Sequence, residues 1–247
     1  MSFKDALLSM YDDCGNHQHS DIRNAIISDG DIFDFPPTHE SEPSRKMVMA
    51  IAFIAYSLVK KFYGESDTIY NYDVVLGSEH PQKDSPNNSR VAPVANNPDN
   101  PDNPDNPTWA LYIGQLYVTW EQVFYEICHE SVHLLNPAKN ADLHKVQRLD
   151  EGVAVKFAEA MYKKYITPYT TKPPMFTPVR FAILSQYTES FNITNKISDE
   201  ALKLVREKFG SFWSVDDDSE FIKIIGDCLT DNEANYILEK FDYNTEM

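Results

Sequence analysis

The apolar positions of this chain recur mostly at the spacing of an α-helix. The strongest example runs from Ser44 to Tyr63. Its apolar residues at helical spacing are Met47, Ile51, Ile54, Ala55, Leu58 and Phe62. That spacing places them on one face of a helix, while Ser44 suits an N-cap and Gly64 suits a C-terminal stop. We expect a long, deeply buried helix whose role is packing.

Two more helices are expected in the middle of the chain. Thr119 and Gln122 have the form of a capping box, and Asn136-Pro137 would end the helix that they begin. The apolar positions of this helix are Trp120, Val123, Phe124, Ile127, Leu134 and Leu135. After a connection, apolar residues return at helical spacing, which predicts a second helix from Asp150 to about Tyr165.

Segments rich in β-branched and aromatic residues predict a small sheet. The expected strands are Thr68–Leu76, a short edge strand at Arg90–Ala95, Trp109–Ile113 and Leu116–Val118. Gly114-Gln115 between the last two suits a hairpin turn. The region 78–108 repeats Asn-Pro-Asp, and its prolines prevent a continuous helix or sheet, so we expect a long exposed loop.

Helices are expected toward both ends of the chain. Near the N-terminus the candidates are Ala6–Tyr11 and Ile22–Ile27, and in the C-terminal part they are Pro178–Tyr187, Asp199–Phe209, Asp217–Leu229 and Asn232–Phe241. Together the elements predict one α+β domain over residues 1–247. It would comprise an N-terminal helix and sheet part (1–108), a core (109–165) and a largely helical part (166–247).

Composition and charge narrow the possible partners. The chain has 22 Lys and Arg against 38 Asp and Glu, a net charge of −16. Such a surface repels phosphate, which argues against nucleic acid and anionic membranes. No apolar run is long enough to span a bilayer, and the N-terminus lacks the pattern of a signal peptide. The three cysteines are far apart and indicate reduced thiols, so we expect a cytoplasmic protein.

The segment 126–133 carries the most specific chemistry in the chain. It contains His129-Glu130-x-x-His133 within the first of the two central helices. On a helix the two histidines project from one face, one turn apart. Two neutral imidazoles so placed can bind a zinc ion, and Glu130 beside them is a candidate general base.

A catalytic zinc needs a third protein ligand and leaves the fourth position to water. Glu151 at the start of the second central helix is our candidate, because two antiparallel helices would bring it back to the histidines. Gly152 would let those two helices approach closely. His144 and Asp150 are alternative third ligands. A metzincin extension is excluded, since it needs glycine and histidine where Asn136 and Lys139 stand.

The pair of motifs His129-Glu130-x-x-His133 and Glu151-Gly152-Val153-Ala154 resembles the gluzincin metallopeptidases, which include thermolysin-like enzymes and zinc aminopeptidases. The resemblance covers about residues 109–165. It implies a zincin-like fold, with a small mixed sheet beside an active-site helix. It also implies one zinc ion per chain, held by His129, His133 and Glu151, with Glu130 activating water.

The resemblance further implies an endopeptidase that cleaves peptide or protein substrates. A sheet edge, Trp109–Ile113 or Leu116–Val118, would pair with an extended substrate. Two features of the family are missing. The Gly-x-Met-Glu-Asn signature of zinc aminopeptidases is absent, and Val155 stands where thermolysin-like enzymes keep an aspartate that supports a ligand.

The transition state also needs a donor for its oxyanion. Tyr187 is the candidate that we favour, with Tyr169 and His144 as alternatives. Glu126, one turn before His129, could orient a ligand or face solvent. Two other interpretations of the motif stay open: a zincin-like module without peptidase activity that binds a protein partner, and an ordinary helix without metal.

Overall fold

Helix α3 (Glu42–Tyr63) lies at the centre of the packing. The computed structural model describes residues 2–15, 19–37, 41–76, 89–94, 107–114, 119–139, 142, 145–170 and 185–243. Every residue of α3 from 50 to 59 is buried, which confirms the predicted packing role. The elements in contact with α3 include α1 (Phe3–Cys14), α2 (Ser20–Asp29), η1 (Gly30–Asp34), α4 (Trp120–His133) and β1 (Tyr70–Leu76).

The ends of α3 test the predicted caps. Gly64 follows its last residue with φ of 98°, a conformation that favours glycine, so the predicted stop is confirmed. The N-cap is Ser41 and not Ser44. The Ser41 hydroxyl accepts a hydrogen bond from the Ser44 backbone N–H, and Ser44 itself is buried in the first turn.

The described strands form one mixed sheet in the order β1-β3-β2, with β2 at Arg90–Pro93 and β3 at Trp109–Ile113. Strand β3 runs parallel to β1 and antiparallel to β2. The predicted edge strand near Arg90 is therefore confirmed. The prediction that β3 offers a free edge is wrong, because it is paired on both sides. The other candidate edge, 116–118, lies outside the described residues.

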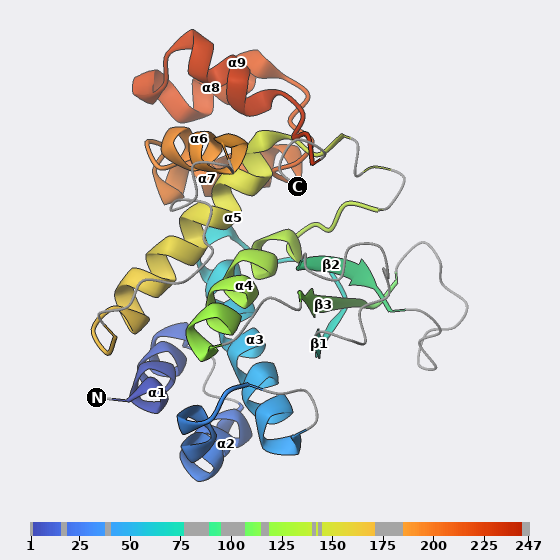
Figure 1. Ribbon diagram of the computed structural model, residues 1–247. Coiled ribbons are helices and arrows are strands. Elements are labelled where there is room, and N and C mark those ends of the chain that lie inside the picture. Colours follow the sequence, from blue (N-terminus) through green and yellow to red (C-terminus); the bar gives the residue numbers. More distant parts are fainter. Residues whose placement is uncertain are drawn as a thin grey trace.

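Helices α4 and α5 (Arg148–Met161) run side by side in opposite directions, and the sheet lies to one side of α4 (Figure 1). A turn of π-helix, η4 (Tyr162–Ile166), continues α5. Thr119 caps α4 as predicted, since its hydroxyl accepts from the Gln122 backbone N–H at 3.2 Å. The second half of the predicted capping box is wrong, because the Gln122 side chain donates instead to Glu126 Oε1 at 2.8 Å.

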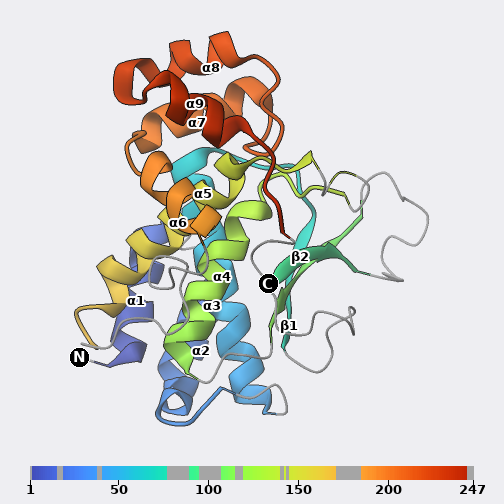
Figure 2. The same cartoon turned by 45° about the horizontal axis from the view of Figure 1, so that its top comes forward.

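The C-terminal helices are α6 (Ser185–Thr194), α7 (Asp199–Phe209), α8 (Asp218–Ile225), the short η5 (Gly226–Cys228) and α9 (Asp231–Leu238). Helices α7, α8 and α9 lie at the top of Figure 2, whereas α6 packs beside α5. Asp217 caps α8, because its side chain accepts a hydrogen bond from the Glu220 backbone N–H at 3.0 Å. Most of the helix expected at 178–187 lies outside the described residues. The helix expected to reach Phe241 ends at Leu238, and the chain beyond it turns back toward α5.

The fold class is confirmed at the level of a mixed α+β protein with a small sheet and many helices. Within the described ranges, none of the helices is both long enough and apolar enough to cross a bilayer. Of the region 78–108, which we expected to be a long loop, only 89–94 and 107–108 are described, and they contain β2 and the approach to β3.

Candidate metal centre

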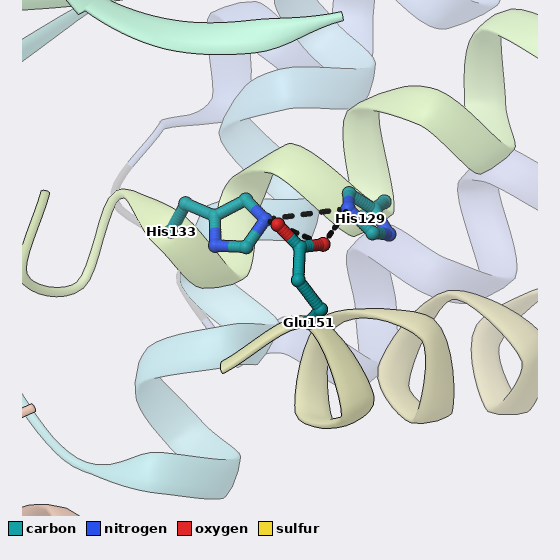
Figure 3. A group of neighbouring side chains, drawn as sticks. All are labelled: His129, His133 and Glu151. Carbon is teal, nitrogen blue, oxygen red and sulfur yellow. Dashed lines mark hydrogen bonds and ion pairs between the residues drawn. The ribbon is translucent and has the colours of Figure 1, made fainter. Parts of the chain in front are cut away.

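The last turns of α4 present the two histidines of the motif to α5. Both project from the same side of the helix, as the four-residue spacing predicts (Figure 3). Their Nε2 atoms are 3.2 Å apart and their ring centroids 5.0 Å apart. The two imidazoles therefore direct the same ring nitrogen at a common point between the helices.

Glu151 reaches that point from the first turn of α5 (Figure 3). Its Oε2 lies 3.2 Å from His129 Nε2 and 3.7 Å from His133 Nε2. Although these are ion-pair distances, Oε2 is buried and has no well-aligned hydrogen bond within the described part of the chain. The predicted convergence of His129, His133 and Glu151 is therefore present, with one donor atom from each residue within 4.8 Å of the others.

The spacing of these donors fits a metal ion. Tetrahedral zinc with bonds of about 2.0–2.1 Å separates its nitrogen and oxygen ligands by about 3.3–3.4 Å. The separations here are 3.2, 3.2 and 3.7 Å. A buried carboxylate is costly unless a positive charge compensates it, and either protonated imidazoles or a bound cation would supply that charge. The three residues could therefore hold a divalent cation.

The charges around this point favour a cation. Burial raises the pKa of Glu151, but the two imidazoles outweigh it and leave the pKa below the ordinary value. Burial lowers the pKa of His133, yet Asp150 and Glu151 raise it well above the ordinary value. His129 shows the same balance against Glu151, and its net pKa is also raised. In the metal-free protein the carboxylates thus attract protons to the position that a cation would fill.

Asp150 supports His133 from the other side of its ring. The distance from His133 Nδ1 to Asp150 Oδ2 is 2.7 Å. A hydrogen bond from Nδ1 to the carboxylate fixes the tautomer in which Nε2 keeps its lone pair for a metal. Asp150, which we considered as a third ligand, therefore lies in the position of a partner to a ligand.

Glu130 is buried next to the donors, with 4% of its surface exposed. Burial raises its pKa to about 7, against the lowering effect of the two histidines. Arg90 on β2 interacts electrostatically with Glu130, and its Cζ lies 5.8 Å from the centroid of the Tyr112 ring. Its buried Nε has no hydrogen bond to a described residue. Sequence reasoning missed Arg90, because nothing in a short strand indicates which helix it faces.

Tyr187 on α6 also lies near the donors, with its ring centroid 6.4 Å from that of His129. Gly152 makes this possible by allowing α6 close to α5. A Cβ at Gly152 would lie 2.3 Å from Thr194 Oγ1 and 2.7 Å from the Ser190 carbonyl oxygen, both on α6. The prediction that Gly152 permits the approach of α4 is therefore wrong; the close neighbour is α6.

The remaining candidates lie elsewhere or outside the described residues. Tyr169 follows η4 and lines a cavity with Phe3 and Gly30 at the far end of α5. The helical stretch from Glu151 to residue 166 spans about 20 Å, so Tyr169 cannot donate to a group at the metal centre. The Glu126 carboxylate accepts a hydrogen bond from the Gln122 side-chain amide. His144 lies outside the described residues.

A second tyrosine, which sequence reasoning missed, contacts the centre directly. The Tyr243 hydroxyl donates to Glu151 Oε1 at 2.7 Å. No pattern in the chain indicates this contact, because Tyr243 follows the last described helix and reaches Glu151 only when the chain turns back. The described part of the centre therefore draws on α4, α5, α6, β2 and the C-terminal segment.

Comparison with models of known protein families, with curated protein sequences and with solved structures found no match for this chain.

Proposed function

We propose that this chain is a zinc-dependent metallopeptidase with a zincin-like, gluzincin-type centre that cleaves peptide or protein substrates. The observation that carries the proposal is the convergence of His129, His133 and Glu151 beside the buried carboxyl group of Glu130. Two imidazoles and one carboxylate are a donor set of catalytic zinc sites, whereas magnesium and calcium favour oxygen donors.

Zinc, when bound in such a set, supplies a Lewis acid that polarises a carbonyl group and lowers the pKa of water. The residues of the chain supply proton transfer and orientation. Glu130 in its carboxylate form accepts the proton of the attacking water and returns it to the leaving amine. In the metal-free protein burial raises the Glu130 pKa to about 7, within the range in which a carboxyl group can both accept and donate a proton near neutral pH.

Two further groups fit this chemistry. Asp150 holds the His133 ring through Nδ1. Tyr187 is the candidate donor to the oxyanion, because its ring lies beside that of His129. Among the described strands, β2 is at the sheet edge next to α4, so an extended substrate would add to β2 by backbone hydrogen bonds.

The test combines metal content with cleavage of quenched fluorescent peptides. We expect about one zinc per chain after reloading, and none in His133→Ala. Glu130→Gln should keep its zinc and lose roughly 10²- to 10⁴-fold in kcat, since it removes the general base. Glu126→Gln is the matched control, because it makes the same change one turn earlier on α4, where the side chain meets Gln122.

Each outcome separates the possible functions. Full cleavage by Glu130→Gln would remove Glu130 from the mechanism. Zinc bound at one equivalent without cleavage of any peptide would favour the alternative, a zincin-like module that binds a protein partner. A wild-type chain without zinc, and without any effect of His133→Ala on metal content, would leave α4 as an ordinary buried helix.

A further inference from the structure

The C-terminal segment Glu239–Tyr243 is attached to the start of α5, the helix that carries Glu151. The Arg148 backbone N–H donates to the Glu239 carbonyl at 2.9 Å, and the Phe241 N–H donates to the Val146 carbonyl at 2.8 Å. Gln147 and Lys240 form an antiparallel bridge between these two contacts. Figure 2 shows the segment leaving α9 and passing toward the centre of the molecule.

A side chain of α6 holds the next part of the segment. Gln186 uses both atoms of its amide on the backbone of Asp242: Nε2 donates to the carbonyl and Oε1 accepts from the N–H, each at 3.2 Å. Phe241 is buried, and its ring lies 4.6 Å from that of Tyr187 and 4.9 Å from that of Tyr243. Backbone pairing, an amide clamp and ring contacts together define where Tyr243 lies.

Because of Tyr243, the two carboxylate oxygens of Glu151 have different partners. Its hydroxyl donates to Oε1 at 2.7 Å. The other oxygen, Oε2, points to the Nε2 atoms of His129 and His133. A carboxylate that is held at one oxygen cannot turn about its terminal bond without losing that hydrogen bond, so the hydroxyl fixes the direction of the oxygen facing the histidines.

We propose that Tyr243 is a positioning residue of the metal centre, and that docking of Glu239–Tyr243 is coupled to metal binding through Glu151. This inference rests on the proposed function only in requiring that His129, His133 and Glu151 bind a metal. Partners of metal ligands typically contribute 10- to 100-fold in metal affinity. Because coupling between two binding events is reciprocal, a bound metal should in turn hold the segment on α5.

Tyr243→Phe tests the inference, because it keeps the ring against Phe241 and removes only the hydroxyl. Tyr165→Phe is the matched control: the Tyr165 hydroxyl also donates to a carboxylate at 2.7 Å, but to Asp13, which is not a member of the metal group. Zinc affinity is measured by competition with a chromophoric chelator. We expect about 10- to 100-fold weaker binding in Tyr243→Phe and wild-type binding in Tyr165→Phe.

The visible spectrum of the cobalt-substituted protein adds a readout that a purely structural role would not change. We expect the bands to shift in Tyr243→Phe, because the direction of Glu151 alters the ligand field, and to stay unchanged in Tyr165→Phe. Gln186→Ala loosens the segment without touching a ligand. It should weaken zinc binding in the same direction, and it decides the question if Tyr243→Phe fails to fold.

Wild-type zinc affinity together with an unchanged cobalt spectrum in Tyr243→Phe would overturn the positioning role and leave the metal site intact. Wild-type affinity in Gln186→Ala would overturn the coupling to the docked segment. If the unaltered chain binds neither zinc nor cobalt, the proposed function itself fails, and the inference fails with it. The binding data for the unaltered chain thus distinguish the two failures.

Discussion

The buried parts of α3 and of the α4–α5 pair differ in chemistry although they lie side by side. From residue 50 to 59, α3 buries mainly apolar side chains, which we call the apolar centre. Between α4 and α5 the chain gathers a polar centre, defined as His129, Glu130, His133, Asp150 and Glu151. The apolar centre is stabilised by removal of surface from water, whereas the polar centre places ionisable groups where water is scarce.

This difference indicates that the two regions contribute differently to the stability of the fold. Buried charges cost free energy unless they are paired and hydrogen-bonded, and a pair often does no better than apolar residues of equal size. The polar centre is therefore weak as a source of stability unless a cation completes it. Perturbing the apolar centre should change stability whatever the metal state, and perturbing the polar centre should change it through the metal.

The largest expected effect is that of metal removal. With zinc at a thousandfold excess over its Kd, binding adds about 4 kcal/mol to the free energy of unfolding. Chelation should therefore lower the melting temperature by roughly 8–16 °C for a chain of this size. Thermal melts with zinc and with chelator measure the difference, and His133→Ala should abolish it. Equal melting temperatures in both conditions would contradict a metal-completed polar centre.

A cavity in the apolar centre should behave in the opposite way. Ile51 is fully buried on α3, so Ile51→Ala should lower the free energy of unfolding by about 2–5 kcal/mol. The loss should be the same with zinc and with chelator, because Ile51 is not a donor. Denaturant unfolding under both conditions is the measurement, with zinc affinity as the check. A loss that depended on zinc would show that the two centres are not separable.

The same contrast explains what could be predicted from the sequence. The apolar spacing predicts α3 and α4, and the spacing of His129 and His133 predicts that they project together, because helix periodicity fixes which residues share a face. The approach of Glu151 follows only from the expected antiparallel packing of the two central helices. Such local rules do not identify the neighbours that a face meets. Gly152 shows this limit: its lack of a side chain is visible in the sequence, but its partner is α6 and not α4.

The supporting contacts of the polar centre were beyond prediction for the same reason. The sequence makes Asp150 a candidate ligand, but only the orientation of the His133 ring places its carboxylate at Nδ1. Arg90 and Tyr243 come from a strand and from the segment after α9. Contacts between such distant segments depend on tertiary packing, which no periodicity in either segment encodes.

Gly152→Ala probes the contact between α5, which carries two residues of the polar centre, and α6. The added methyl group would collide with Thr194 Oγ1 and with the Ser190 carbonyl, which belongs to the backbone and cannot rotate away. We expect a loss of about 1–3 kcal/mol in the free energy of unfolding, together with lower activity, because α6 carries Tyr187.

The control for this prediction is a double-mutant cycle with Thr194→Ala, which removes the nearest atom. Thr194 Oγ1 has no hydrogen-bond partner among the described residues, so its removal leaves none of their polar groups newly unpaired. Partial recovery of stability in the double variant is expected. Strict additivity of the two losses would mean that Gly152 does not act through contact with α6.

Asp150→Asn should weaken metal binding by about 10- to 100-fold with little change in the stability of the metal-free fold. The amide keeps the shape of the side chain and can still accept a hydrogen bond from His133 Nδ1. It lacks the negative charge that makes the imidazole a stronger ligand for a metal ion. Competition with a chelator measures the affinity. Unchanged zinc affinity would show that Asp150 serves packing and not the metal centre.

The pH dependence of metal binding separates the polar centre from the apolar centre, because only the polar centre contains groups that gain or lose protons near neutral pH. In the metal-free protein the pKa values of His129 and His133 are raised by the carboxylates around them. Binding needs neutral imidazoles, so the metal must displace protons near neutral pH. Affinity should therefore increase with pH and fall as pH decreases, by about tenfold, or 1.4 kcal/mol, per pH unit for each proton released.

Calorimetry in buffers of different ionisation enthalpy counts those protons. Asp150→Asn removes a carboxylate that raises the pKa of His133, so it should release fewer; an equal count in both proteins would mean that Asp150 does not control the charge of the centre.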